Sequence, residues 1–123
     1  MSSALHDIPS TASFGSLILP TAATASGTGS ALGSLSGDGP EFALVQIGTP
    51  SSGATIAVSI EESSDLSTWT AIAGATTGTK SAAATVALPY QRTKTYVRAR
   101  LVVAGSSPSI PVAVACGQQK KLW

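Results

Sequence analysis

The chain has little charge and few aromatic residues. Of its 123 residues, 11% are charged and 5% are aromatic, whereas about a quarter of a soluble domain is commonly charged. A chain of this length suits one domain that can bury a real core. It has too little charge to cover the whole surface of that domain with polar groups. We therefore expect another protein to cover part of the surface.

Two further scarcities argue against catalysis and metal binding. Cys116 is the only cysteine, which excludes an internal disulfide and a cysteine-based metal cluster, and we interpret it as a small buried hydrophobic residue. His6 is the only histidine and lies far from the expected core, so no Ser-His-acid or Cys-His set is expected. We predict a protein that is not an enzyme, with no catalytic residues, no metal and no cofactor.

The few charges are unevenly distributed along the chain. All six acidic residues occur by position 65, and all seven basic residues occur from position 80 onward. The fold is expected either to place opposite charges on different faces or to pair them across strands. Without a dense basic patch, we expect no nucleic-acid partner. No apolar run approaches the roughly 20 residues that span a membrane, and the N-terminus lacks the basic region of a signal peptide.

Short alternating segments dominate the rest of the sequence. In "ATIAVSIEE" the residues Ile56, Val58 and Ile60 share one face, and "TYVRARLVV" alternates in the same way. About eight such strands are separated by Gly, Ser and Pro turns, with no amphipathic helix. This predicts an all-β fold: a single antiparallel immunoglobulin-like β-sandwich. The expected divisions are an extended N-terminal arm at 1–13, the sandwich at 14–117 and a C-terminal tail at 118–123.

The alternation also predicts which residues form the core and which pair outside it. Glu61 lies on the polar face of one strand, and Arg98 and Arg100 lie on that of another, so we expect a cross-strand ion pair. The predicted core comprises Ile56, Val58, Ile60, Trp69, Ile72, Val97, Leu101, Val103, Val112 and Val114.

The stretch "VSIEESSDLSTWTAIAG" at 58–74 is the best candidate for a site. Glu61 and Glu62 are adjacent in a strand, so their side chains should point to opposite faces and not converge on a metal. Asp65 suits a turn in which its carboxylate caps backbone amides. We expect Trp69 to be a core aromatic, with a sugar-stacking platform as the alternative. The stretch is therefore interpreted as a hairpin.

The segments "LPTAATASGTGSAL", "VSIEESSDLSTWTAIAGA" and "TYVRARLVVAG" together resemble a family of small structural proteins of tailed bacteriophages. "VSIEESSDLSTWTAIAGA" is similar to that family's "QESDDGSTWTDI", and "TYVRARLVVAG" is similar to "RYVRAxVTVxG". "LPTAATASGTGSAL" corresponds to an "APxxxTATxxGTG" hairpin. The similarity spans about residues 17 to 117. Where the family has Asp-Gly in the turn, this chain has Asp65-Leu66, which could expose Leu66 to a partner.

The resemblance implies a virion protein on the capsid surface, made in the host cytoplasm and bound to the major capsid protein. We infer a head decoration or cement protein that also self-associates. The alternatives are a tail or head-tail connector subunit, and a carbohydrate-binding or adhesin module. Candidate interface residues lie mostly near the two ends, where aromatic and apolar side chains are costly to leave in water: His6, Ile8, Phe14, Leu66, Leu122 and Trp123.

Overall fold

The computed structural model describes residues 12–33 and 41–119, and every regular element in them is a strand. Residues His6, Ile8, Leu122 and Trp123 lie outside the described residues, so their predicted interface role stays a prediction. The strands are β1 (Ala12–Ala23), β2 (Gly27–Thr28), β3 (Glu41–Ile47), β4 (Thr55–Ser63), β5 (Thr70–Thr76), β6 (Ala84–Tyr90), β7 (Tyr96–Ala104) and β8 (Ile110–Gln119).

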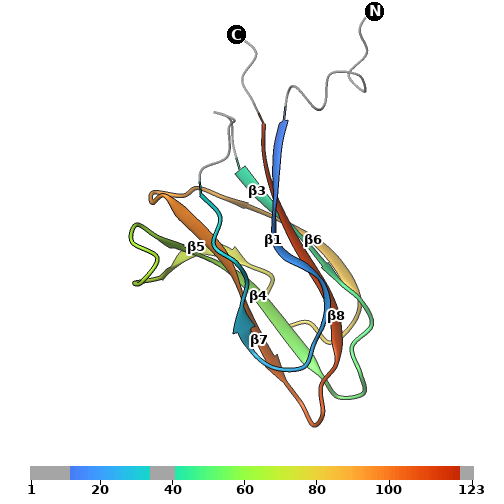
Figure 1. Ribbon diagram of the computed structural model, residues 1–123. Coiled ribbons are helices and arrows are strands. Elements are labelled where there is room, and N and C mark those ends of the chain that lie inside the picture. The colour runs from blue at the N-terminus through green and yellow to red at the C-terminus, as the bar shows by residue number, and fades with distance from the viewer. Residues whose placement is uncertain (1–11, 34–40, 120–123) are drawn as a thin grey trace, which may run out of the picture.

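Two four-stranded antiparallel sheets face each other, which confirms the all-β sandwich prediction. Their strand orders are β1-β8-β3-β6 and β2-β7-β4-β5 (Figure 1). The first and last strands of the chain, β1 and β8, extend beyond the predicted limits of the sandwich, because Ala12 pairs with Gln119. Two residues assigned to the arm and two assigned to the tail therefore belong to the first sheet.

The pairing follows one rule: the chain forms nested antiparallel hairpins. Strand β4 pairs with β5, β3 with β6, β2 with β7 and β1 with β8. Alternate pairs fall in opposite sheets, as in an eight-stranded jelly roll. The immunoglobulin-like order is not confirmed. In that order the last two strands share a sheet, whereas β7 and β8 here lie in opposite sheets.

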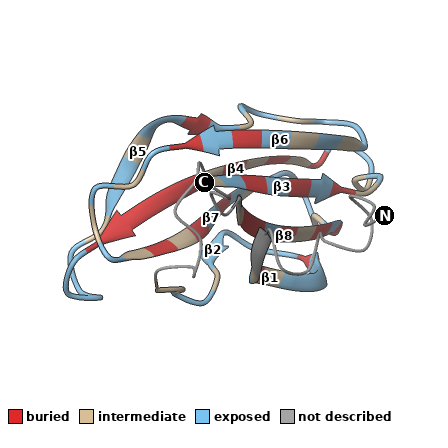
Figure 2. Cartoon of the chain, turned by 90° about the horizontal axis from the view of Figure 1, so that it is seen from above, coloured by how far each residue is buried: buried red, intermediate tan, exposed pale blue. Residues whose placement is uncertain are grey.

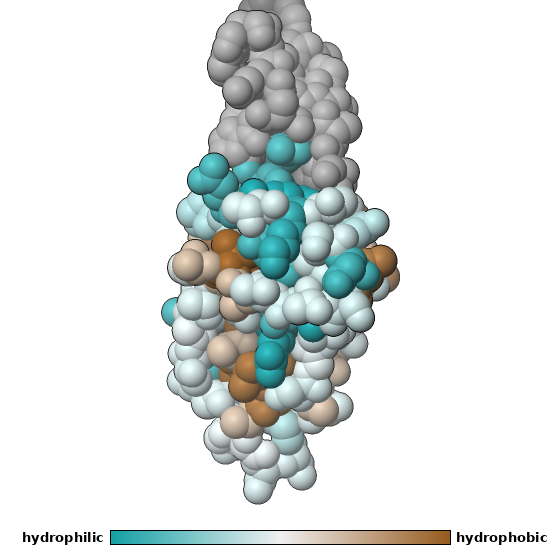
Figure 3. Space-filling view, turned by 90° about the vertical axis from the view of Figure 1, so that its left-hand side faces the viewer, coloured by the Kyte–Doolittle hydropathy of each residue, from teal (hydrophilic) through white to brown (hydrophobic). Residues whose placement is uncertain are grey.

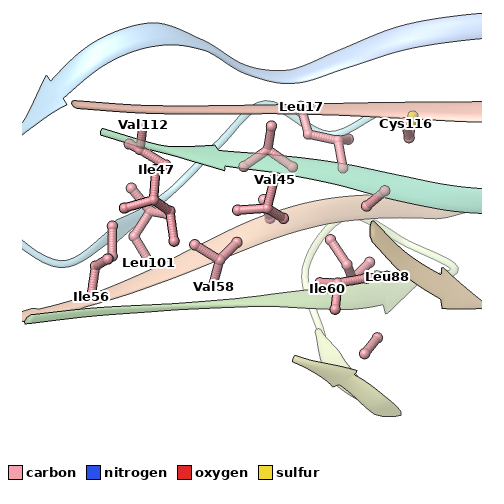
Figure 4. Packing of buried hydrophobic residues seen from close by; sticks show 14 of the residues in the cluster. Leu17, Val45, Ile47, Ile56, Val58, Ile60, Leu88, Leu101, Val112 and Cys116 are labelled. Carbon is pink, nitrogen blue, oxygen red and sulfur yellow. The ribbon is translucent and has the colours of Figure 1, made fainter. Parts of the chain in front are cut away.

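The core lies between the two sheets and is built by the predicted alternation. In β3, the residues Ala43, Val45 and Ile47 are buried while those between them are exposed. Figure 2 shows this alternation of buried and exposed residues along β3 and β6. In Figure 4, side chains from β3 and β8 of one sheet meet those from β4 and β7 of the other.

Most of the predicted core residues are buried. Seven of them form part of the buried cluster: Ile56, Val58, Ile60, Val97, Leu101, Val112 and Val114. Ile72 and Val103 are partly buried and pack against this cluster. Trp69 is half-buried and does not belong to it, so the prediction of a core tryptophan is wrong. Cys116 is buried, as predicted.

Candidate functional site: an uncharged sheet face and a projecting loop

The outer face of the β1-β8-β3-β6 sheet carries no charged side chain among the described residues. Within the bounds of these four strands the one charged residue is Glu41, which aligns with the inward-facing positions of β3. Register and alternation place apolar and uncharged polar residues on the outer side. We call this surface the uncharged face: Ser16, Phe42, Leu44, Gln46, Thr85, Ala87, Pro89, Pro111, Ala113 and Ala115.

The uncharged face is suited to close contact with another protein. Phe42 and Leu44 on β3 are 37% and 36% exposed. Leu44 pairs in register with Ala87 on one side and Ala115 on the other, so short side chains flank it. A shallow pocket of about 200 Å³ lies beside it, where Ile18 and Pro20 of β1 approach β3 and β8. A partner docking here would desolvate no charge of the face itself.

Charges on the β2-β7-β4-β5 sheet pair across strands. The predicted pair is confirmed: Arg98 Nε donates to Glu61 Oε1 at 2.9 Å, and the two residues are register partners on β7 and β4. Arg100 Nη1 lies 3.6 Å from Glu61 Oε2, and its side chain is 56% exposed. Of the two expected arrangements, cross-strand pairing is therefore the one found among these residues.

A second charged cluster closes the end of the sandwich at which β3 begins and β6 ends. Arg92 donates to both carboxylate oxygens of Glu41, at 2.7 and 2.6 Å, and Tyr90 Oη donates to the same carboxylate at 3.0 Å. Arg92 also donates to the carbonyl of Thr95 at 2.6 Å. Burial, together with the Glu41 charge, raises the pKa of Tyr90 above its ordinary value. This cluster ties the β6–β7 loop to the first sheet.

Glu62 ties the same loop to the second sheet. Its carboxylate accepts hydrogen bonds from the amide and hydroxyl of Thr93 and from the amide of Lys94. Burial opposes ionisation of Glu62, but these hydrogen bonds and the Lys94 charge outweigh it, so the pKa of Glu62 is below its usual value. Glu61 and Glu62 thus have separate partners, as predicted for adjacent strand residues.

The β4–β5 loop is held by a compact hydrogen-bond network. Asp65 Oδ1 accepts from the amides of Ser67 and Thr68, each at 2.9 Å, and from the hydroxyl of Ser63. These bonds hold the pKa of Asp65 below its usual value. Ser63 Oγ in turn accepts from the amides of Asp65 and Leu66. The predicted capping role of Asp65 is confirmed, and the loop is a structured turn.

Leu66 is the unusual residue of this turn. Its φ is +66°, a left-handed conformation that costs a residue with a Cβ about 1–2 kcal/mol. Its side chain is 51% exposed. A glycine would adopt this φ without the penalty. Leucine at this position therefore combines a strained backbone with apolar surface left in water.

Trp69 follows the turn and lies against the charged pair on the sheet surface. The Arg98 guanidinium lies 4.2 Å from the centre of its ring, and its Nε1 donates to the carbonyl of Leu66 at 3.3 Å. One ring face is therefore occupied by a cation. Figure 3 shows the side from which this loop projects, where hydrophilic residues separate small hydrophobic areas.

A groove opens along the edge of the sandwich between β1 and β2. Its volume is about 660 Å³, and it is lined by uncharged residues, with Leu17, Ile18, Leu19 and Leu101 as its large apolar side chains. Shifts in the β1–β8 register occur in this stretch of β1, between Ser16 and Thr21. Sequence periodicity did not predict the groove, because it depends on which strands lie at the sheet edges.

Phe14, a predicted interface residue, lies in β1 opposite Gly117.

Within residues 12–33 and 41–119, no group of three His, Cys, Asp or Glu side chains is placed to hold a metal. The same residues include no helix long and apolar enough to cross a membrane.

Comparison of this chain with protein-family models, with curated proteins and with solved structures gives no match.

Proposed function

We propose that the protein is a non-enzymatic virion component that decorates a phage head, with its uncharged face docked on the major capsid protein. The observation that carries this proposal is the absence of charge from one whole described sheet face that still exposes Phe42 and Leu44. Docking such a face costs little polar desolvation, and its apolar area contributes roughly 25 cal/mol per Å² gross.

Two further points support a decoration role. The jelly-roll strand order occurs in viral capsid domains, though also in lectins, so it supports the proposal by analogy. The resemblance to phage structural proteins covers the Asp65 turn and β7. A shell offers many identical binding sites, and linked copies of a decoration protein bind it with avidity. Bridging contacts between capsid subunits would oppose the pressure of packaged DNA.

The adhesin alternative is not favoured by the aromatic residue on which it rested. A sugar-stacking platform needs an open ring face, and Arg98 already occupies one face of the Trp69 ring. A tail or connector subunit would also use an uncharged docking face, so the test must separate heads from tails.

The test is binding to purified particles of the cognate phage. Leu44→Asp places a charge at the centre of the uncharged face, and Val102→Asp is the matched control, because Val102 is a 48% exposed apolar residue in the other sheet. Both variants should keep a β-type circular dichroism spectrum. Co-sedimentation with undecorated heads should weaken at least tenfold for Leu44→Asp and remain near the parent value for Val102→Asp.

Three outcomes would contradict the proposal. Equal binding by both variants would remove the uncharged face from the interface. Loss of binding only in Val102→Asp would move the interface to the other sheet. Binding of the parent protein to isolated tails but not to heads would favour the tail alternative.

A further inference from the structure

The turn that carries Leu66 is built to present that side chain before any partner arrives. Its backbone is fixed by bonds from Ser63 and Asp65, and the Trp69 indole binds the carbonyl of Leu66 itself. Little ordering of the loop is therefore needed on binding, which is the condition for an effective anchor residue. A strained and exposed leucine where glycine would relax the backbone points to a role for the side chain.

The groove between β1 and β2 is a receptor surface of matching chemistry on another part of the same molecule. Its lining has no charged residue, and its volume of about 660 Å³ exceeds that of one leucine side chain, so the tip of a loop can enter. The amide of Ser30 donates to the carbonyl of Leu17 across the two walls at 3.2 Å. This bond holds β1 and the segment after β2 at a fixed separation.

Charge near the two surfaces is complementary. Asp65 is exposed, is adjacent to Leu66 and is held in its charged form by the hydrogen bonds of the turn. Arg100 is the register partner of Thr28, which lines the groove. The Arg100 side chain is more than half exposed, and its contact with the Glu61 carboxylate is long, at 3.6 Å from Nη1 to Oε2, so it can engage a second carboxylate.

We propose that Leu66 of one copy of this chain inserts into the β1–β2 groove of a second copy, with Asp65 facing Arg100 of that copy. The two surfaces differ, so the contact is heterologous: each copy offers one loop and one groove. Repetition of such a contact produces a closed ring or an open chain of subunits. This inference is independent of capsid binding, because it concerns the free protein in solution.

The experiment measures self-association by sedimentation velocity over a concentration series. The parent protein should form species larger than a dimer. Leu66→Gly removes the inserted side chain while relieving the positive φ. Gly27→Leu fills the groove, and a Cβ at Gly27 meets no atom within 4 Å, so the fold should tolerate it. Each variant should raise the apparent Kd of self-association at least tenfold without lowering the yield of folded protein.

Mixing the two variants separates this contact from a symmetric one. The intact Leu66 of the Gly27→Leu protein can enter the intact groove of the Leu66→Gly protein, so the mixture should form one-to-one dimers and nothing larger. Leu44→Ser on the uncharged face is the control and should associate like the parent. A monomeric parent, self-association unchanged in both variants, or a mixture that remains monomeric would each overturn the proposal.

Discussion

The Glu41–Arg92 pair gives the sharpest test of how the end of the sandwich is held. The side chains of Arg92 and Glu41 are only 11% and 9% exposed, and the carboxylate accepts from Tyr90 as well as from Arg92. Glu41→Gln preserves the shape of the side chain but removes its charge. The Arg92 guanidinium is then left nearly buried without a counter-ion. A buried charge without a counter-ion strongly destabilises the folded state.

Removing one partner of a buried pair costs about 3–5 kcal/mol. We expect this loss in the free energy of unfolding of Glu41→Gln, against a total of about 5–15 kcal/mol for a domain. At about 4 °C per kcal/mol for a chain of this size, Tm should fall by about 12–20 °C. Arg92→Met should cost a comparable amount, and the double variant should cost less than the sum because neither charge is then left unpaired.

Urea denaturation at pH 7 measures these values, provided that the slope m stays constant across the variants. Arg100→Met is the control, because that arginine is mostly exposed and its contact with Glu61 is long, so its loss should cost below about 1 kcal/mol. A cost for Glu41→Gln as small as that of the control would refute the reasoning, as would strictly additive costs in the double variant.

Three other predictions concern the second sheet. Trp69→Ala should destabilise the protein by about 1–2 kcal/mol in urea denaturation, because the ring is only half-buried under Arg98. Removing a buried aromatic side chain costs more, about 3–5 kcal/mol. A loss of that size would place the ring in the core. A double-mutant cycle on Glu61 and Arg98 should give a coupling of about 0.2–1 kcal/mol, and a coupling of zero would contradict the observed bond. The lowered pKa of Glu62 means that its stabilisation is full above the ordinary value of 4.5 and is lost as the pH falls through the folded-state pKa. Stability should therefore fall less between pH 7 and pH 3 in Glu62→Gln than in the parent, and equal falls would contradict the shift.

The sequence predicted those features that depend on neighbours along the chain. Alternation in "ATIAVSIEE" identified Ile56, Val58 and Ile60 as inward-facing, and the same pattern placed Glu61 opposite a basic residue on β7. The turn role of Asp65 followed from the short reach of its carboxylate to nearby amides. In each case local geometry determines the result.

Features that depend on distant pairing escaped prediction. Trp69 was expected in the core because aromatic residues are scarce, but it stacks under Arg98, whose proximity is created by the β4–β7 pairing. The strand order could not be derived from periodicity, because the same alternation fits an immunoglobulin-like sandwich and a jelly roll. The uncharged face could not be predicted from the sequence, because it depends on β1, β8, β3 and β6 sharing one sheet.

The nested pairing of the strands has a consequence for folding kinetics. Strand β1 cannot acquire its only partner in the first sheet until β8 has been synthesised, since Ala12 pairs with Gln119. Contacts of such long sequence separation slow folding. Because Ala12 and Gln119 lie side by side in the sheet, a short linker could join them, and new termini could be opened in the β4–β5 loop. That circular permutation would turn the β1–β8 pair into a local hairpin and should speed the assembly of the first sheet, at the expense of separating the β4–β5 pair.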